Sequence, residues 1–257
     1  MKYQACFFDL YGTLMDIRTE ESKPFLWEIM SDWYSSHGAR YTPDGLREAY
    51  LTQVEAETES VRKRYAEQGI HVKYPEPEIG NVFSCLFEDK EIHAGKELIR
   101  DTAQLYRQTS RRYFRLYAGA AELLESLRQA GIRVCLLSNA QRLFTEEELR
   151  ESGIYDLFEE IFISSDYGVK KPDPVFFETA VRKIGMDPSR CLMVGNDIEC
   201  DMEGAVATGM SGYYIYSKLS PDSDRKRSIP AGCISQKGMN LKLVQRYILR
   251  QYKDHTD

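Results

Sequence analysis

Apolar and polar residues follow two different rhythms along this chain. Five short apolar runs have the length of buried strands: residues 4–9, 133–138, 160–163, 191–194 and 212–216. Apolar residues recur at helical spacing over the stretches that alternate with them: residues 120–129, 145–152, 174–184 and 198–208. Strands and helices that alternate in this way are typical of βαβ units. We therefore expect an α/β fold with a Rossmann-like, doubly wound parallel sheet as its core.

A long stretch of helical character separates the first apolar run from the second. Charged residues recur there at the spacing of a helix face, as in Glu59 and Lys63, and no β-rich segment interrupts the pattern. The segment therefore reads as an insertion placed directly after the first strand. We expect an all-helical cap over residues 17–116 and an α/β core formed by residues 1–16 and 117–257.

The charge of the chain narrows the range of expected partners. There are 34 Lys and Arg residues against 40 Asp and Glu residues, which gives a formal net charge of −6. The chain therefore lacks the global positive field with which proteins bind nucleic acids and anionic membranes. No uncharged run reaches the length of about 18 residues that a membrane span needs, and Asp9 interrupts the first apolar run, unlike in a signal peptide. The six cysteines form no Cys-x-x-Cys pair, so we expect a cytoplasmic protein.

Several enzyme classes lack their motifs in this sequence. It contains no Gly-x-Gly-x-x-Gly, Walker, His-Glu-x-x-His or Gly-x-Ser-x-Gly segment. The four histidines lie outside the predicted strand ends, so a histidine-based metal site or a Ser-His-Asp triad has little to build on. The remaining candidate chemistry is that of carboxylates.

Polar side chains follow the predicted strands at the points where these strands end. In open parallel sheets, the ligand crevice lies outside the carboxyl ends of the strands. The residues found there are Asp9, Tyr11, Thr13, Ser138, Asn139, Lys171, Asn196, Asp197 and Asp201. We expect these side chains to converge on one patch that contains carboxylates, hydroxyls and a lysine.

Four segments in this order resemble the motifs of the haloacid dehalogenase-like hydrolase superfamily. Residues 7–14 (Phe-Phe-Asp-Leu-Tyr-Gly-Thr-Leu) resemble its nucleophile motif, and residues 136–139 (Leu-Leu-Ser-Asn) its second motif. Residues 168–174 (Gly-Val-Lys-Lys-Pro-Asp-Pro) are similar to its lysine motif, and residues 194–201 (Val-Gly-Asn-Asp-Ile-Glu-Cys-Asp) to its acidic motif. The helical insertion resembles the C1-type cap of this superfamily. The resemblance thus extends over essentially the whole chain.

The resemblance implies a role for each matching residue. Asp9 is the implied nucleophile, which forms a covalent aspartyl intermediate that water then hydrolyses. Lys171 is the implied cation beside it, because the lysine of the motif directly precedes the proline; Lys170 is the alternative. Thr13 and Ser138 are expected to donate hydrogen bonds to phosphoryl oxygens, and Asn139 to shape the same edge.

The resemblance also implies a Mg²⁺ ion and a small phosphorylated substrate. Mg²⁺ accepts one or two carboxylates together with phosphate oxygens and water. The expected ligands are Asp9, Asp197 and the backbone carbonyl of Tyr11, with Asn196 as the alternative to Asp197. If Asp197 is the ligand, Asn196 and Asp201 are expected to orient Lys171 or metal-bound water.

Tyr11 departs from the phosphatase pattern and leaves other functions open. Phosphatases of the superfamily usually carry a second aspartate there as acid and base, and tyrosine is a poor base at neutral pH. The Asp-x-Tyr-Gly-Thr form is similar to that of the metal-independent 2-haloacid dehalogenases. Two positions argue against that alternative: Asp197 retains a metal-binding charge, and Phe177 replaces a tyrosine that the dehalogenases share. A dehalogenase also needs an arginine to hold the substrate carboxylate. Arg18 lies close in sequence, but a basic residue just past a turn is ordinarily exposed. A Mg²⁺-dependent phosphatase is favoured, and a weakly active or inactive binding homologue is the third possibility.

The sequence assigns no specificity residue. Aromatic residues of the cap, Tyr106 among them, recur at helical spacing and are expected to belong to its core.

Overall fold

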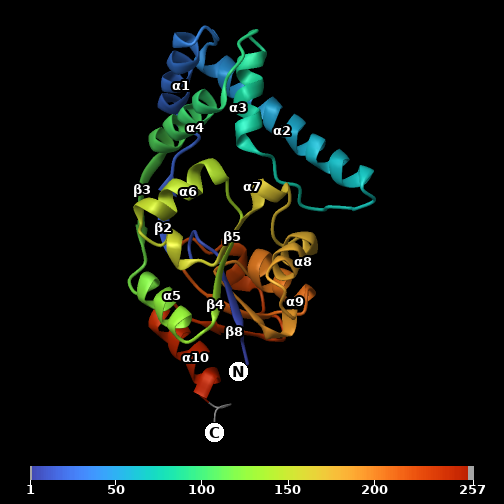
Figure 1. Cartoon of the computed structure of the whole chain (residues 1–257). Helices are drawn as coiled ribbons and strands as arrows, with labels where there is room; N and C mark the ends of the chain where they lie inside the picture. The colour runs from blue at the N-terminus through green and yellow to red at the C-terminus, as the bar shows by residue number, and fades with distance from the viewer. Residues whose placement is uncertain (1, 254–257) are drawn as a thin grey trace.

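The core of the protein is a six-stranded parallel sheet. The computed structural model (Figure 1) describes residues 2–253, and in it the strand order is β5-β4-β1-β6-β7-β8. The strands are β1 (Ala5–Phe8), β4 (Arg133–Ser138), β5 (Glu160–Ile163), β6 (Cys191–Gly195), β7 (Ser211–Ile215) and β8 (Cys233–Gln236). The first strand along the chain thus lies at the centre of the sheet. The expected α/β fold with a parallel sheet is confirmed.

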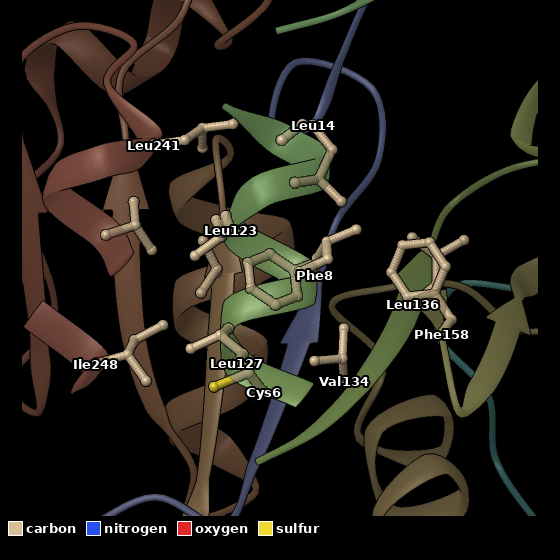
Figure 2. Close-up of a cluster of buried hydrophobic side chains, with 14 of the residues drawn as sticks. Cys6, Phe8, Leu14, Leu123, Leu127, Val134, Leu136, Phe158, Leu241 and Ile248 are labelled. Atoms are coloured by element: carbon tan, nitrogen blue, oxygen red, sulfur yellow. The ribbon is translucent and has the colours of Figure 1, made fainter. Parts of the chain in front are cut away.

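Alternate residues of the central strand pack on opposite faces of this sheet. Cys6 and Phe8 belong to one hydrophobic cluster, which is covered by α5 (Ala120–Gln129) and α10 (Leu241–Lys253). Figure 2 shows Leu123 and Leu127 of α5 against these two side chains. Ala5 and Phe7 belong to the cluster on the other face, under α8 (Pro174–Lys183) and α9 (Gly204–Ala207). With both faces covered, a strand must be apolar throughout, which explains the continuous apolar runs in the sequence.

The insertion forms a helical cap with a core of its own. Its helices are α1 (Pro24–Ser36), α2 (Pro43–Glu67), α3 (Ile79–Glu88) and α4 (Lys96–Ser110). Their apolar faces meet in a separate cluster that includes Trp27, Tyr34, Phe83 and Tyr106. Among residues 2–253, no helix is sufficiently long and apolar to cross a membrane.

The ends of the insertion are strands, although the whole segment was expected to be helical. β2 (Met15–Thr19) and β3 (Arg111–Leu116) pair in an antiparallel ribbon that joins the cap to the core (Figure 1). In β3 the exposed residues Arg112, Tyr113 and Arg115 surround the partly buried Phe114. Exposed and partly buried residues alternate only over residues 113–116, and the charged residues around this short stretch concealed the strand pattern.

A second attachment ties the cap to the core near the lysine motif. Pro75 bridges Val169 in antiparallel fashion, and the amide of Glu76 donates to the carbonyl of Gly168 at 3.0 Å. The carboxylate of Asp173 accepts the amides of both Lys73 and Tyr74, at 2.7 and 3.2 Å. The cap is thus attached to the core at two places, through the β2–β3 ribbon and through the contacts of residues 73–76 with residues 168–173.

Several other elements differ in their bounds or type from those predicted from the sequence. The expected helix over 145–152 begins earlier, as α6 (Arg142–Glu151), and α7 (Ser164–Tyr167) follows β5 directly. The segment 198–208, expected to be one helix, is a π-helical turn, Ile198–Glu203, followed by α9. β8 and α10 were not predicted, because the segments around them are rich in polar residues.

The central strand makes a prediction for stability. Replacement of Phe8 by Ala empties a fully buried position between the sheet and α5. We expect the free energy of unfolding to fall by about 3–5 kcal/mol, as measured by urea denaturation. Leu243→Ala on α10, where the side chain is 42% exposed, is the control and is expected to change it by less than about 0.5 kcal/mol. Equal losses in the two variants would contradict the assignment of Phe8 to the core.

Candidate active site

Asp9 lies at the carboxyl end of the central strand and is almost completely buried. Its backbone amide donates to the carbonyl of Val194 at 2.9 Å, so the strand pairing continues to this residue. Its carboxylate receives hydrogen bonds from Lys171 at 2.9 Å and from the Thr13 hydroxyl at 3.2 Å. The Ser138 hydroxyl lies 3.5 Å away. The structure therefore brings together residues from the ends of three segments that are far apart in the sequence.

Lys171 is the cation of the site. Its ammonium group also donates to Asp201 at 2.6 Å, so it is shared between two buried carboxylates. Burial alone would lower the pKa of Lys171, but the Asp201 and Asp9 carboxylates raise it above its ordinary value, and the amine stays protonated. Lys170, the alternative from the sequence, lies outside this cluster and pairs with Glu76 of the cap at 3.1 Å.

Asn139 fixes the backbone of Lys171. Its side-chain oxygen accepts the Lys171 amide at 2.8 Å, and its side-chain nitrogen donates to the Lys171 carbonyl at 3.0 Å. The end of β4 therefore holds the lysine loop in register with the nucleophile loop. An amide in this arrangement positions the lysine rather than a phosphoryl group.

Asn196 lies against the turn that follows Asp9. Its amide group is 3.2 Å from both the Tyr11 carbonyl and the Asp9 carboxylate, and 3.1 Å from the Thr13 hydroxyl. Gly12 makes this approach possible: its φ is +91°, and a Cβ added there would lie 2.4 Å from the Asn196 nitrogen. The turn thus requires glycine both for its backbone conformation and for the space.

Asp197 and Asp201 have different surroundings. The Asp197 carboxylate accepts the Cys200 amide at 2.8 Å and so caps the following π-helical turn, while it also lines the cavity beside Asp9. Asp201 is fully buried and accepts the Asp197 amide at 3.0 Å in addition to Lys171. A Cβ on Gly195 would lie 2.1 Å from the Asp201 carboxylate, so glycine is required there.

The hydroxyl of Tyr11 points away from Asp9 into a network of charged side chains. It donates to the carboxylate of Glu148 on α6 at 2.5 Å and lies 3.1 Å from the Thr145 hydroxyl. Glu148 is fully buried and also accepts hydrogen bonds from Arg107 at 2.8 Å and from Arg111 at 2.9 Å. Burial and the Glu148 charge both raise the pKa of Tyr11. The Tyr11 hydroxyl therefore stays protonated, and its proton is used in the hydrogen bond to Glu148.

Sequence reasoning did not identify Glu148 or Arg107. Glu148 stands in the run Glu146-Glu147-Glu148, where nothing in the sequence distinguishes it from its neighbours. The available signal was indirect: a glutamate at a buried position of an amphipathic helix needs a partner.

Two residues weighed for a dehalogenase lie outside the site. The Arg18 side chain is 63% exposed and pairs with Glu20 at 2.9 Å. Phe177 is buried under the sheet, where its ring lies against Gly204. Neither side chain faces Asp9.

Two cavities meet at the nucleophile loop. The smaller, of about 170 Å³, is lined by Asp9, Lys171 and the acidic motif. The larger, of about 400 Å³, lies between the cap and the core. Tyr11 and Asn139 line both, so the larger cavity begins where the smaller one ends.

The site thus consists of an aspartate that shares a lysine with a second acid, at the carboxyl edge of a parallel sheet and beneath an inserted helical cap, as the sequence resemblance implies. The chain belongs to the haloacid dehalogenase-like hydrolase family, whose model matches residues 3–209. The family resemblance noted in the sequence is thereby confirmed.

Several curated relatives of the chain are named as phosphatases. The glyceraldehyde 3-phosphate phosphatase of Methanothermobacter thermautotrophicus is 34% identical over 106 residues, which cover 41% of this chain and 47% of the relative. The phosphoserine phosphatase of Thermus thermophilus is 30% identical over 133 residues, which cover 52% and 53%. The chain thus spans about half the length of these curated relatives.

A solved structure shows the same fold. The 2-haloacid dehalogenase of Pseudomonas syringae pv. Tomato DC3000 superimposes over 97% of this chain and 99% of that chain, with a TM-score of 0.62 and 18% identity. A likeness at this identity shows a shared architecture and leaves the reaction open.

The two adjacent lysines make a prediction that separates their roles. Lys171→Met leaves the buried carboxylates of Asp9 and Asp201 without a cation, so we expect the free energy of unfolding at pH 7 to fall by about 3–5 kcal/mol. The folded variant then takes up protons more readily than its unfolded chain, and the deficit shrinks as the pH falls. Lys170→Met, at a pair that is 40% exposed on the lysine side, is expected to cost less than about 1 kcal/mol. Urea denaturation at two pH values measures both; a deficit independent of pH would argue against the buried pairing.

Proposed function

We propose that the protein is a Mg²⁺-dependent phosphatase that hydrolyses a small phosphate monoester through an aspartyl-phosphate intermediate. The observation that carries this proposal is the Asp9 carboxylate held 2.9 Å from the Lys171 ammonium group at the bottom of a cavity. A carboxylate is a nucleophile without prior deprotonation, and the fixed cation reduces its repulsion from a phosphate dianion. The phosphatase names of the curated relatives point in the same direction.

In the first step, an Asp9 oxygen forms a bond to phosphorus while the bond from phosphorus to the ester oxygen breaks. The ester oxygen leaves with the electron pair of that bond. In the second step, water attacks the phosphorus atom, inorganic phosphate is released and the Asp9 carboxylate is restored. Lys171, Thr13 and Ser138 surround the carboxylate and donate hydrogen bonds to it or to the phosphoryl oxygens as charge shifts between them.

The oxygen donors beside Asp9 fit a magnesium ion. The Asn196 side-chain amide lies 3.2 Å from both the Asp9 carboxylate and the Tyr11 carbonyl, and with its nitrogen turned toward them it donates to both. Asp9, Tyr11 and the charged Asp197 line the same small cavity. Among residues 2–253, no cluster of three or more acidic, histidine or cysteine side chains forms a metal site, and Mg²⁺ needs only one or two carboxylates when a phosphate and water complete its shell. Asp9, the Tyr11 carbonyl and Asp197 would hold the ion, with Asn196 as the alternative to Asp197. When bound, the ion would neutralise phosphate charge as the bond to phosphorus forms.

The hydrogen bond of Tyr11 limits which phosphate esters we expect the enzyme to hydrolyse. Because its hydroxyl proton is donated to Glu148, Tyr11 is not free to protonate a departing alkoxide. We propose that the enzyme acts best on esters whose leaving group departs without a proton.

The same tyrosine favours a second candidate function. A metal-independent 2-haloacid dehalogenase releases halide, which needs no proton, and its nucleophile motif has the Asp-x-Tyr-Gly-Thr form found here. The position of Arg18 argues against it, because this side chain is 63% exposed, pairs with Glu20 and lines neither of the two cavities at the nucleophile loop. A weakly active or inactive binding protein is the third candidate.

Asp9→Asn tests the covalent step. The substitution removes the nucleophilic charge with little change of shape, so we expect turnover to fall by at least about a thousandfold while circular dichroism stays unchanged. Asp222→Asn, at a side chain that is 92% exposed, is the control and is expected to keep full activity. An Asp9→Asn variant with near-normal activity would show that the intermediate forms elsewhere.

Leaving-group acidity and a chelator together test the choice of reaction. Without a general acid, aryl phosphates should be hydrolysed faster than alkyl phosphates by roughly a hundredfold to ten-thousandfold, measured as phosphate release. EDTA should abolish this activity. A dehalogenase would instead release halide from 2-chloropropionate, unaffected by EDTA, and would release no phosphate. An inactive homologue would release neither product.

A further inference from the structure

The larger cavity is where the leaving group of a substrate must lie. In phosphoryl transfer, the attacking and leaving oxygens lie roughly in line, so a phosphate ester attacked by Asp9 directs its organic part away from that residue. The cavity of about 400 Å³ between cap and core adjoins the nucleophile cavity, with which it shares Tyr11 and Asn139 in its walls. Its walls therefore determine which organic groups are accepted.

The polar side chains of these walls are already engaged with one another. Gln141 donates to Glu76 at 2.8 Å and to the Pro77 carbonyl at 2.9 Å, and it accepts the Ile79 amide at 2.9 Å. Glu76 also pairs with Lys170 at 3.1 Å. Few hydrogen-bonding groups of this wall are thus left for a hydroxylated substrate.

Two further polar side chains of this wall also form hydrogen bonds within the protein. Both Arg107 and Thr145 are occupied by the network around Glu148 and Tyr11. Glu21, which lines the cavity from the cap, is exposed to solvent.

Aromatic rings supply the remaining surface. The rings of Tyr106 and Phe144 are nearly parallel, at 10° and with 6.0 Å between centroids, and those of Tyr50 and Tyr106 lie at 22° and 5.7 Å. Two of these residues come from the cap and one from α6, and aliphatic side chains such as Val54 complete the wall. Tyr106 is 2% exposed and stacks between the other two rings, so a ligand meets the exposed parts of Tyr50 and Phe144. This aromatic surface accommodates a flat apolar group better than a hydroxylated chain, whose hydration would be lost without replacement.

We infer that the substrate is the phosphate monoester of a planar aromatic hydroxyl compound, whose ring lies against Tyr50 and Phe144. The inference rests on the phosphatase function proposed above, and two independent features converge on it. The ring wall selects a flat apolar group, and the engaged proton of Tyr11 selects an acidic leaving group. In the reaction, the bond from phosphorus to the aryl oxygen breaks, the phenolate leaves with the electron pair and takes a proton from water, and phosphate is formed by water attack on the Asp9 intermediate.

Two esters of comparably acidic alcohols separate the contribution of the ring from that of the leaving group. Phenyl phosphate carries a ring, whereas hexafluoroisopropyl phosphate does not. We expect kcat/KM of the full chain with Mg²⁺ to be at least about tenfold higher for phenyl phosphate. Acetyl phosphate, which has no ring and an excellent leaving group, reports phosphatase activity independently of the cavity wall.

Matched substitutions locate the ring preference. Phe144 and Phe158 are both 8% exposed, but Phe158 belongs to the cluster around β1 and does not line the cavity. Phe144→Leu is expected to reduce the preference for phenyl phosphate severalfold, mainly through KM, whereas Phe158→Leu is expected to retain it. If Phe144→Leu does not fold, competitive inhibition of the wild-type chain decides: phenylphosphonate should inhibit at least about tenfold more tightly than isopropylphosphonate.

The outcomes distinguish this inference from the function on which it rests. A ring preference that Phe144→Leu removes and Phe158→Leu retains supports it. Equal kcat/KM for phenyl and hexafluoroisopropyl phosphate, or a preference that both variants retain, overturns the aromatic class while the phosphatase function stands. Absence of phosphate release from every ester, acetyl phosphate included, overturns both.

Discussion

The Lys171 ammonium group, shared by Asp9 and Asp201, is the interaction on which the site depends. All three groups are buried, and a charge removed from water is tolerated only where other charges and hydrogen bonds compensate it. The surrounding residues supply that compensation: Asn139 fixes the lysine backbone, and the Asp197 amide donates to Asp201. A rigid parallel sheet is a suitable support, because its strand ends hold the partners in place before any substrate arrives.

A second charged centre, around Glu148, connects the cap to the nucleophile loop. One carboxylate accepts hydrogen bonds from Tyr11 in the nucleophile loop, from Arg107 in α4 and from Arg111 at the start of β3. Displacement of the cap would leave this buried carboxylate partly unpaired, which is unfavourable. The position of the cap, the direction of the Tyr11 hydroxyl and the shape of the larger cavity are therefore mutually dependent.

The sequence predicted those parts of the molecule that repeat a simple pattern. The buried strands were visible as apolar runs, and because parallel strands end at one edge, Asp9, Ser138 and Lys171 could be expected to lie together before the structure was known. The roles given to these residues remain predictions. The ribbon of β2 and β3 was missed because charged residues mask the short alternating stretch of β3. Glu148 was missed because its partners lie 37 to 137 residues away, and no local pattern records such pairings.

Tyr11 is one member of a set rather than an isolated replacement of an aspartate. An aspartate at position 11 is too short to reach Glu148, so it would leave this buried carboxylate without the hydrogen bond that the Tyr11 hydroxyl donates. The tyrosine thus completes the hydrogen bonding of Glu148 together with Arg107 and Arg111. The network that secures the cap therefore requires a tyrosine-like donor at the position where an acid and base would otherwise lie. The hydroxyl that binds Glu148 and so links the nucleophile loop to the cap is therefore not free to take part in proton transfer beside Asp9.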